Sequence, residues 1–278
     1  MTAHRNRGGK RTAIAAGSIL LLLFTLGPFV WMLWVSLASR PDLVLQGEAT
    51  YGFGNYVNVL TSPTLHFGAY FRNSLIVAIV ASVAVTAIAS VAGYAVSRIR
   101  FPGRLLVPIF VLAMSMFPPI SIVGYLYKLF AGSGLLNTHT ALILPYAALT
   151  VSLGLWINMS YFAQIPVELD EAALVDGAGR LTALFRVVLP LALPGIFSAF
   201  LLVFIACFNE FLFALMLTLD PSAQTLPVGI ALFEGLHGEV PWGNLMAASA
   251  LATLPLVLLT VVFQRFIVQG LTGGAVKG

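Results

Sequence analysis

Charged residues are scarce in this sequence: Asp, Glu, Lys and Arg together make up 9% of the 278 residues, while hydrophobic residues make up 59%. A soluble domain carries about 25% charged residues. So few charges cannot keep a globular surface in water, which excludes an ordinary soluble protein. Because runs of about 20 apolar residues cross a bilayer as helices, the fold class is predicted to be an all-α integral membrane protein.

Cysteine and clustered histidine are also lacking. Cys207 is the only cysteine, so the chain can form neither an internal disulfide nor a cysteine-based metal site. The four histidines, His4, His66, His139 and His237, are scattered and form no H-E-x-x-H motif. We therefore expect no metal site and no catalytic residue. A membrane-embedded enzyme is disfavoured, because it needs a nucleophile or a metal cluster at membrane depth.

Nucleotide-binding and nucleic-acid-binding patterns are missing as well. No phosphate-binding loop of the form G-x-x-x-x-G-K-[ST] is present, and Gly9-Lys10-Arg11 lacks both its spacing and its hydroxyl. The net charge of +4 comes from short basic clusters between apolar runs. A nucleic-acid-binding protein would instead present a basic face interleaved with aromatic residues, so nucleic acid is not an expected partner.

Six uncharged runs are long enough to cross a hydrocarbon core about 30 Å thick. The predicted spans lie near residues 12–37, 74–97, 105–127, 140–162, 195–217 and 244–266, within a single transmembrane domain over residues 1–278. The first run exceeds the about 7–15 residues of a signal-peptide core. It also carries Trp31 and Trp34, which suit the membrane interface, so it is interpreted as a retained span.

The distribution of Lys and Arg predicts the orientation. Eleven of the 14 lie at the two termini and in the second and fourth loops, and three lie on the other side. Because cytoplasmic loops retain positive charge, both termini are predicted to be cytoplasmic. The longer loops 40–72 and 218–243 then face outward. We expect the second of them to contact an external partner.

The fourth loop, residues 166–190, carries the most informative pattern. Pro166 can open a helix at its first position, and the acids that follow it suit the positive end of the helix dipole. Gly177 and Gly179 stop this helix. A second short helix with one apolar face should follow and end at Pro190. The members of that face are Leu181, Leu184, Phe185 and Val188.

These two helices joined by a glycine turn suit insertion into a socket on another protein, because Ala172 and Ala173 keep one side small. The alternative is an amphipathic helix that rests on lipid. Such helices are usually rich in Lys and Arg, whereas this loop begins with acids, so a protein partner is favoured.

Several strings occur in order along the chain. They are Asn73-Ser74; Tyr94-Ala95-Val96-Ser97-Arg98 with Phe101-Pro102-Gly103; Glu171-Ala172-Ala173 with Asp176-Gly177-Ala178, Phe185, Leu189-Pro190 and Pro194; Asn209-Glu210-Phe211; and the tail from Gly270 to Gly278. Together they resemble the permeases of binding-protein-dependent ABC importers, in their carbohydrate branch, and the tail resembles that of the maltose-importer permeases. The loop string resembles the "EAA" loop of that family. Phe208 departs from the pattern, since the family often has Trp there.

The resemblance implies a type I ABC importer permease, in which the fourth loop is a cytoplasmic helix-turn-helix that couples the spans to a separate ATPase. The residues expected to make this contact are Glu171, Ala172, Ala173, Asp176, Gly177 and Ala178. The tail residues Gly273, Gly274 and Lys277 would reach between the ATPase subunits. ATP and Mg would be bound by the partner ATPase, and this chain would bind no cofactor itself.

The implied partners are an ABC ATPase dimer, a second permease subunit in a heterodimer, an extracytoplasmic solute-binding protein and membrane lipid. The implied location is the inner membrane of a bacterial or archaeal cell, with the chain as a multi-pass subunit. Transport would follow alternating access driven by ATP. Disaccharides, oligosaccharides and glycerol-phosphate-like solutes all remain open as substrates.

Asn209 and Glu210 fall within the predicted span 195–217, where an ionisable side chain rarely faces lipid. One interpretation is that they hydrogen-bond sugar hydroxyls in the substrate pathway. The other, which is favoured, is that they join helices or pair with the second permease. An ion-coupled secondary transporter of small polar solutes is the alternative function. It would place several ionisable groups near the bilayer midplane, where this chain offers essentially Glu210 alone.

Overall fold

The computed structural model describes residues 6–41, 44, 49–233 and 240–272. Within those ranges the secondary structure is helical, apart from turns and one isolated β-bridge between Ala38 and Tyr51. The predicted all-α fold class is confirmed. The chain divides into two compact units, residues 1–65 with 232–253 and residues 66–231 with 254–278. That residues 1–278 act as a single domain stays a prediction.

The first unit contains α1 (Asn6–Leu37), α2 (Gly54–Thr61) and the first turns of α12 (Trp242–Thr272), which continues into the second unit. The Asn55 side chain ties these parts together. Its Nδ2 donates to the backbone carbonyls of Ser36 at 2.9 Å and Ala38 at 2.8 Å. A Cβ atom at Gly243 would come within 2.6 Å of the same nitrogen, so α12 begins directly against this amide.

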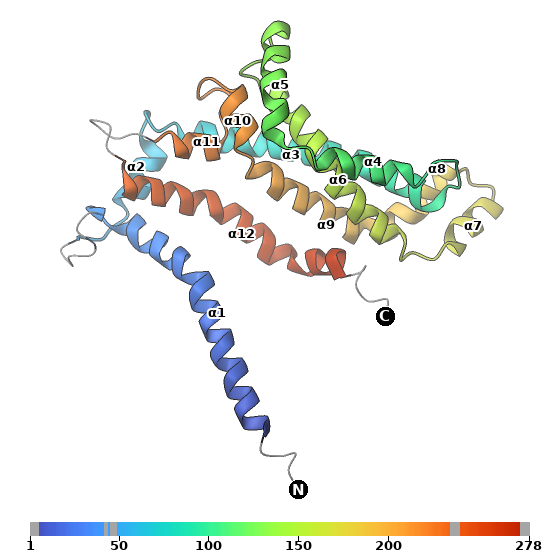
Figure 1. Cartoon of the computed structure of the whole chain (residues 1–278), viewed down its shortest axis with the longest axis horizontal. Helices are drawn as coiled ribbons and strands as arrows, with labels where there is room; N and C mark the ends of the chain where they lie inside the picture. Colours follow the sequence, from blue (N-terminus) through green and yellow to red (C-terminus); the bar gives the residue numbers. More distant parts are fainter. Residues whose placement is uncertain (1–5, 42–43, 45–48, 234–239, 273–278) are drawn as a thin grey trace. The chain divides into compact units, whose positions relative to one another are not determined.

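The second unit is built around three long helices that pack side by side, α3 (Phe67–Arg98), α6 (His139–Phe162) and α9 (Leu189–Phe208) (Figure 1). Small residues bring them close together. A Cβ atom at Gly154 of α6 would lie 3.1 Å from Val85 and 3.2 Å from Ala89, both on α3. Such close approach gives membrane helices the dispersion contacts that hold them together. The shorter elements are α4 (Leu106–Ser115), α5 (Pro119–Ser133), α7 (Glu168–Val175), α8 (Arg180–Ala183), the π-helix η2 (Leu184–Val188), α10 (Leu212–Leu217) and α11 (Leu226–Ala231).

Five helical stretches of the described chain are long and apolar enough to cross a membrane, and a sixth is counted if α4 and α5 form one bent span. The five are Ile14–Leu37, Phe67–Arg98, His139–Phe162, Arg180–Phe208 and Trp242–Gln264. Four of them overlap the predicted spans 12–37, 74–97, 140–162 and 244–266. Many of their large apolar side chains are exposed on the chain, as expected for surfaces that meet lipid.

The third predicted span, 105–127, is not one uninterrupted helix. α4 ends at Ser115, α5 begins at Pro119, and the two are bent by 86°. Pro118 has an extended backbone with ψ of 124°, because a residue that precedes proline avoids the α conformation. Pro119 then opens α5, where its missing N–H does no harm.

The fifth predicted span, 195–217, is displaced towards the N-terminus. The helical stretch runs from Arg180 to Phe208, and the chain breaks at 209–211 before the short α10. Glu210 therefore lies in a three-residue break that follows the continuous helix, and not within a helix over 195–217. Its position inside the membrane stays a prediction.

The start of α3 holds the segment that follows α10. The Asn73 amide donates hydrogen bonds of 3.0–3.1 Å to three backbone carbonyls within residues 221–224. Next to it, Ser74 Oγ accepts a 2.7 Å hydrogen bond from the backbone N–H of Leu226. Most of residues 223–229 are buried. The first part of the loop predicted over 218–243 is thus an internal segment rather than a solvated connector.

A second amide closes the turn before this segment. Asn137 Oδ1 accepts a 2.8 Å hydrogen bond from the backbone N–H of Leu219, and Asn137 Nδ2 donates to Asp220 Oδ2 at 2.8 Å. Hydrogen bonds from the side chain and backbone of Ser222, and from Asn137, hold the pKa of the exposed Asp220 carboxyl below its ordinary value. The turn is therefore held in place by polar contacts that favour the ionised form of Asp220.

Candidate functional site

The helix α7 begins where the sequence places its acids. Glu168, Asp170 and Glu171 occupy its first turn, where unpaired backbone N–H groups favour negative charge. Glu168 and Glu171 are exposed, whereas Asp170 is buried. The predicted acidic helix start is confirmed, and one of its three acids points into the protein.

The end of α7 is a glycine turn. Gly177 has a φ of +86°, a left-handed conformation that glycine adopts without a Cβ penalty. Its N–H bonds the carbonyl of Leu174, and the N–H of Ala178 bonds that of Ala173, which is the paired pattern of a Schellman motif. The predicted stop at Gly177 is confirmed.

The residues predicted to contact an ATPase form one exposed surface on this turn. Glu171, Ala172, Asp176 and Gly177 are exposed, and Ala178 is partly exposed. Ala173 is the exception, since it is buried against the rest of the protein. Apart from the two neighbouring residues in sequence, no heavy atom lies within 4 Å of a Cβ atom built at Gly177, so the turn is open on its outer side. The surface is acidic and small-sided, as a protein partner would require for close approach.

The apolar face predicted for the second short helix is only half buried. Leu184 and Val188 are 1% and 0% exposed, whereas Leu181 and Phe185 are 69% and 59% exposed. Val175, at the end of α7, is 87% exposed. Exposed apolar side chains next to an acidic turn mark a surface that contacts lipid or protein.

The prediction that the second short helix ends at Pro190 is wrong. The helix continues through η2 into α9, so that Arg180–Phe208 is one uninterrupted helical stretch. In η2 the hydrogen bonding changes to the wider i→i+5 pattern, seen in the bond from the N–H of Leu189 to the carbonyl of Leu184. The wider turn accommodates Pro190, whose ring would otherwise clash with a carbonyl one α-turn earlier.

A buried polar cluster connects α7 to the end of α3. Arg98 Nε lies 3.4 Å from Asp170 Oδ2 as an ionic contact, and the two side chains are 4% and 9% exposed. The Tyr94 hydroxyl donates a 3.0 Å hydrogen bond to the other carboxylate oxygen, Asp170 Oδ1. Arg98 Nη2 also donates to the backbone carbonyls of Phe162, at 2.7 Å, and Ile165. One arginine therefore joins α3, the end of α6 and α7.

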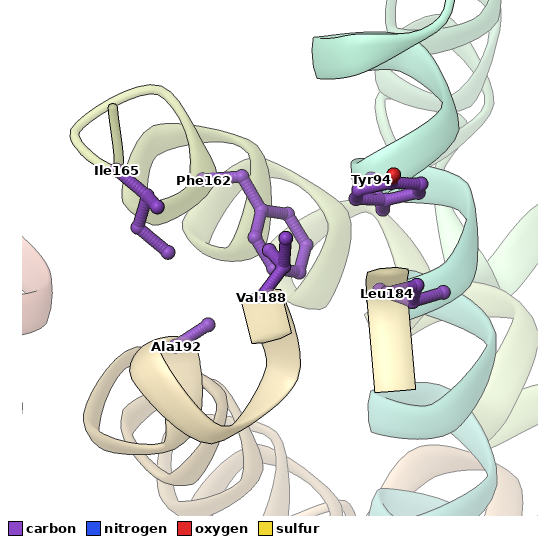
Figure 2. Close-up of a cluster of buried hydrophobic side chains, with 6 residues drawn as sticks. All are labelled: Tyr94, Phe162, Ile165, Leu184, Val188 and Ala192. Carbon is purple, nitrogen blue, oxygen red and sulfur yellow. The ribbon is translucent and has the colours of Figure 1, made fainter. Parts of the chain in front are cut away.

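Apolar packing surrounds this cluster. Figure 2 shows six buried side chains that come from α3, the end of α6 and the linker after it, η2 and α9, and that lie against one another. They are Tyr94, Phe162, Ile165, Leu184, Val188 and Ala192. The Tyr94 and Phe162 rings meet edge to face with centroids 6.2 Å apart. The base of the α7–α8 turn is thus a packed core, while its tip is open.

Asn209 and Glu210 lie at the far end of α9 from this turn. The helical stretch of 29 residues between them and Gly179 is roughly 44 Å long at 1.5 Å per residue. Glu210 accepts hydrogen bonds from the backbone N–H groups of Phe213 at 2.9 Å and Ala214 at 3.3 Å, so it caps α10. Asn209 is exposed, and its Nδ2 donates to the carbonyl of Ile205 at 2.8 Å.

A buried tyrosine lies beside Glu210. The Tyr146 side chain is 1% exposed, and its hydroxyl is close to both Glu210 and Thr225. The hydroxyl oxygen has no partner at hydrogen-bond distance in the described chain. The structure thus brings Glu210 to a polar position near one end of the helices, with Asn209 beside it, and keeps both apart from the α7–α8 turn.

Sequence reasoning missed the roles of Tyr94, Arg98 and Asp170. Tyr94 and Arg98 stood out as parts of a string, and Asp170 as one acid among three, but nothing local links residues that lie 72 and 76 positions apart in the chain. The predicted tail contacts, Gly273, Gly274 and Lys277, lie outside the described residues. Within the described chain, no group of three or more His, Cys, Asp and Glu side chains could hold a metal ion.

Comparison with known proteins adds to this geometry. The family described as "Binding-protein-dependent transport system inner membrane component" matches residues 85–273. The chain is 54% identical to the trehalose/maltose transport system permease protein MalG of Thermococcus litoralis, over 97% of this chain and 98% of that protein. It is 36% identical to the trehalose transport system permease protein SugB of Mycobacterium tuberculosis, over 93% of this chain and 95% of that one.

Solved structures agree on the fold. A chain of a bacterial ABC transporter involved in the import of the acidic polysaccharide alginate superposes with a TM-score of 0.74 at 23% identity, over 93% of this chain and 97% of that one. The same type of alginate transporter, solved in complex with an alginate pentasaccharide-bound periplasmic protein, gives a TM-score of 0.70 at 16% identity, over 94% of each chain.

Proposed function

Because the chain belongs to the family of binding-protein-dependent transport system inner membrane components, we propose that it is the permease subunit of an ATP-driven ABC importer for a sugar. The observation that carries the proposal is the 54% identity to a trehalose/maltose permease along almost the whole chain. The chain supplies the membrane path and has no catalytic role. A separate ATPase hydrolyses ATP, with Mg, and drives alternating access.

The substrate is a di- or oligosaccharide, and trehalose and maltose are the first to test. Two relatives are named for these sugars, at 54% and 36% identity. Asn209 and Glu210 are the polar residues we assign to the substrate pathway. Asn209 is exposed and Glu210 partly exposed, so hydroxyl-bearing solutes would find polar partners there.

The α7–α8 turn is the contact for the ATPase dimer. The docking surface is formed by exposed residues and by the partly exposed Ala178, and the buried Ala173 fixes α7 against the permease. The exposed residues are Glu171, Ala172, Asp176 and Gly177. Acids at the helix start suit basic residues on the ATPase. The tail, through Gly273, Gly274 and Lys277, reaches the same partner.

The turn accordingly faces the cytoplasm, with both termini, and the complex lies in the inner membrane of a bacterial or archaeal cell. A second permease subunit pairs with this chain as a heterodimer. An extracytoplasmic solute-binding protein delivers the sugar, a role supported by the periplasmic protein in complex with one solved relative. Since residues 223–229 are mostly buried, that protein contacts the later part of the 218–243 loop.

The proposal is tested by purifying the chain with an affinity tag from its native cells and measuring sugar uptake in proteoliposomes. An ATPase subunit should copurify at fixed stoichiometry, and uptake of labelled trehalose or maltose should fall to background without ATP. Vesicles given a non-hydrolysable ATP analogue serve as the control. An ion-coupled secondary transporter would instead show uptake by the chain alone under a proton or sodium gradient, and that result would overturn the importer assignment.

A further inference from the structure

The α7 helix is attached to the three long helices in different ways. It is continuous with α6 through residues 163–167, and it reaches α9 through α8 and η2, against which it mainly packs. α3 has no such chain connection to α7. The link between them is the buried cluster of Tyr94, Arg98 and Asp170, here called the polar lock.

We propose that the polar lock makes α7 and the end of α3 move as one body, so that force applied by the ATPase at α7 reaches the spanning helices through α3 as well as α9. The proposal rests on the proposed function, because it presumes an ATPase at the α7–α8 turn. Tyr94, Arg98 and Asp170 are then positioning residues for coupling, and none of them touches ATP or sugar.

The geometry of the lock favours rigid transmission. Each oxygen of the Asp170 carboxylate has its own partner on α3, Tyr94 Oη at 3.0 Å and Arg98 Nε at 3.4 Å. A charge pair with both members almost fully buried resists separation, because either ion alone would be stranded away from water. The hydrogen bond from the Tyr94 hydroxyl to the Asp170 carboxylate also fixes orientation, so α7 cannot turn about its axis without breaking it.

Arg98 extends this constraint to α6. Its guanidinium donates to the carbonyl of Phe162, the last residue of α6, and to that of Ile165 in the linker that follows. These carbonyls lie at or just beyond the helix end, where a cation is favoured by the helix dipole. The end of α6 and the linker that follows it are therefore each held to α3 by one hydrogen bond.

Two variants break the lock while sparing the packing. Tyr94→Phe removes one hydroxyl and keeps the ring on Phe162. The double variant Arg98→Gln with Asp170→Asn removes both charges together, so no unpaired ion is left buried. Tyr161→Phe and Arg100→Gln are the matched controls, since no hydrogen bond or ion pair of either side chain is found within the described chain.

The readout is the number of sugar molecules transported per ATP hydrolysed by the complete complex in proteoliposomes. We expect both lock variants to assemble with the ATPase and hydrolyse ATP, with a transport ratio lowered by about 2- to 30-fold, while the controls match wild type. An unchanged ratio in the double variant would overturn the lock. If the double variant does not assemble, Tyr94→Phe decides, both in this assay and as the variant used in the distance measurement below. Failure of any ATPase to copurify with wild type would count against the proposed function instead.

A distance measurement separates coupling from simple stability. With Cys207, the only cysteine, replaced by alanine, spin labels are attached at Arg100→Cys after α3 and Val175→Cys at the end of α7, both exposed positions. With the lock intact, the distance between the labels should be the same in nucleotide-free and ATP-bound complex. In the double variant it should change on ATP binding. A change of equal size in both would refute the idea of one moving body.

Discussion

At the scale of single residues, two glycines set how closely helices approach in the second unit. A Cβ atom at Gly195 on α9 would lie 2.1 Å from the Tyr161 ring on α6, and one at Gly229 on α11 would lie 2.1 Å from the Tyr70 ring on α3. In both places an aromatic ring occupies the volume that any other side chain would need. Each of these two helix contacts therefore requires glycine, because even the single methyl group of alanine would overlap the ring.

Gly195→Ala should lower the thermal stability of the purified permease. The added methyl overlaps the Tyr161 ring, and overpacking of this kind costs about 1–3 kcal/mol. Gly124→Ala on α5, where nothing lies within 4 Å of the new Cβ, is the control and should be neutral or slightly stabilising. In a Tyr161→Ala background the Gly195→Ala change should have no cost. A persistent cost in that background would show that Tyr161 is not the cause.

The residue scale is also where prediction from sequence stopped. The acids of α7 and the stop at Gly177 follow from local rules of helix ends, and both were predictable. The contacts of Asn73 with residues 221–224, and of Arg98 with Asp170, join positions far apart in the chain. No periodicity or propensity encodes such pairs, because they arise only once the helices have packed.

At the scale of elements, the spans were predictable where charge alone delimits an apolar run, and unpredictable where the helix is interrupted or prolonged. Pro118 and Pro119 break the third span, but Pro190 and Pro194 lie in the uninterrupted stretch that includes α9. The difference is that η2 widens the helix before Pro190, whereas consecutive prolines force an extended residue. Glu210 could not be placed either, since its capping of α10 depends on where α9 ends.

The turn between α7 and α8 gives a prediction at this scale. Gly177→Asp should abolish ATP-coupled uptake while the chain inserts at the wild-type level, because a carboxylate at the open tip of the turn would be buried where the partner approaches most closely. Gly177→Asn is the matched neutral variant. Asparagine tolerates left-handed backbone better than most residues, so it should keep the turn and retain part of the uptake. Insertion is measured by membrane fractionation, and normal uptake by Gly177→Asp would contradict the docking role.

At the scale of the whole molecule, the topology follows from one long element. The stretch Arg180–Phe208 is roughly 44 Å long, more than a hydrocarbon core of about 30 Å requires. We therefore predict that its two ends lie on opposite sides of the membrane. The α7–α8 turn precedes one end, and the turn at Leu219 and Asp220 follows the other.

Thiol labelling tests this arrangement. In a Cys207→Ala background, Val175→Cys should react with a membrane-impermeant maleimide only in inside-out vesicles. Leu219→Cys should react only in right-side-out cells whose cell wall or outer membrane has been removed. Both side chains are exposed, at 87% and 63%, so accessibility is set by the side of the membrane. Labelling of both positions from one side would rule out the single crossing.

The π-helical turn η2 has a consequence for the phase of the helix that contains it. One such turn contains one residue more than a turn of a regular α-helix. In a regular α-helix each residue adds a rotation of about 100° around the helix axis. Because the wider turn takes up this residue, loss of one residue within Leu184–Val188 would close η2 into a regular α-turn and leave Leu181 and Phe208 in nearly the same angular relation. Loss of a residue elsewhere in Arg180–Phe208, where no wider turn can absorb it, would instead rotate the two ends of the helix relative to each other by about 100°.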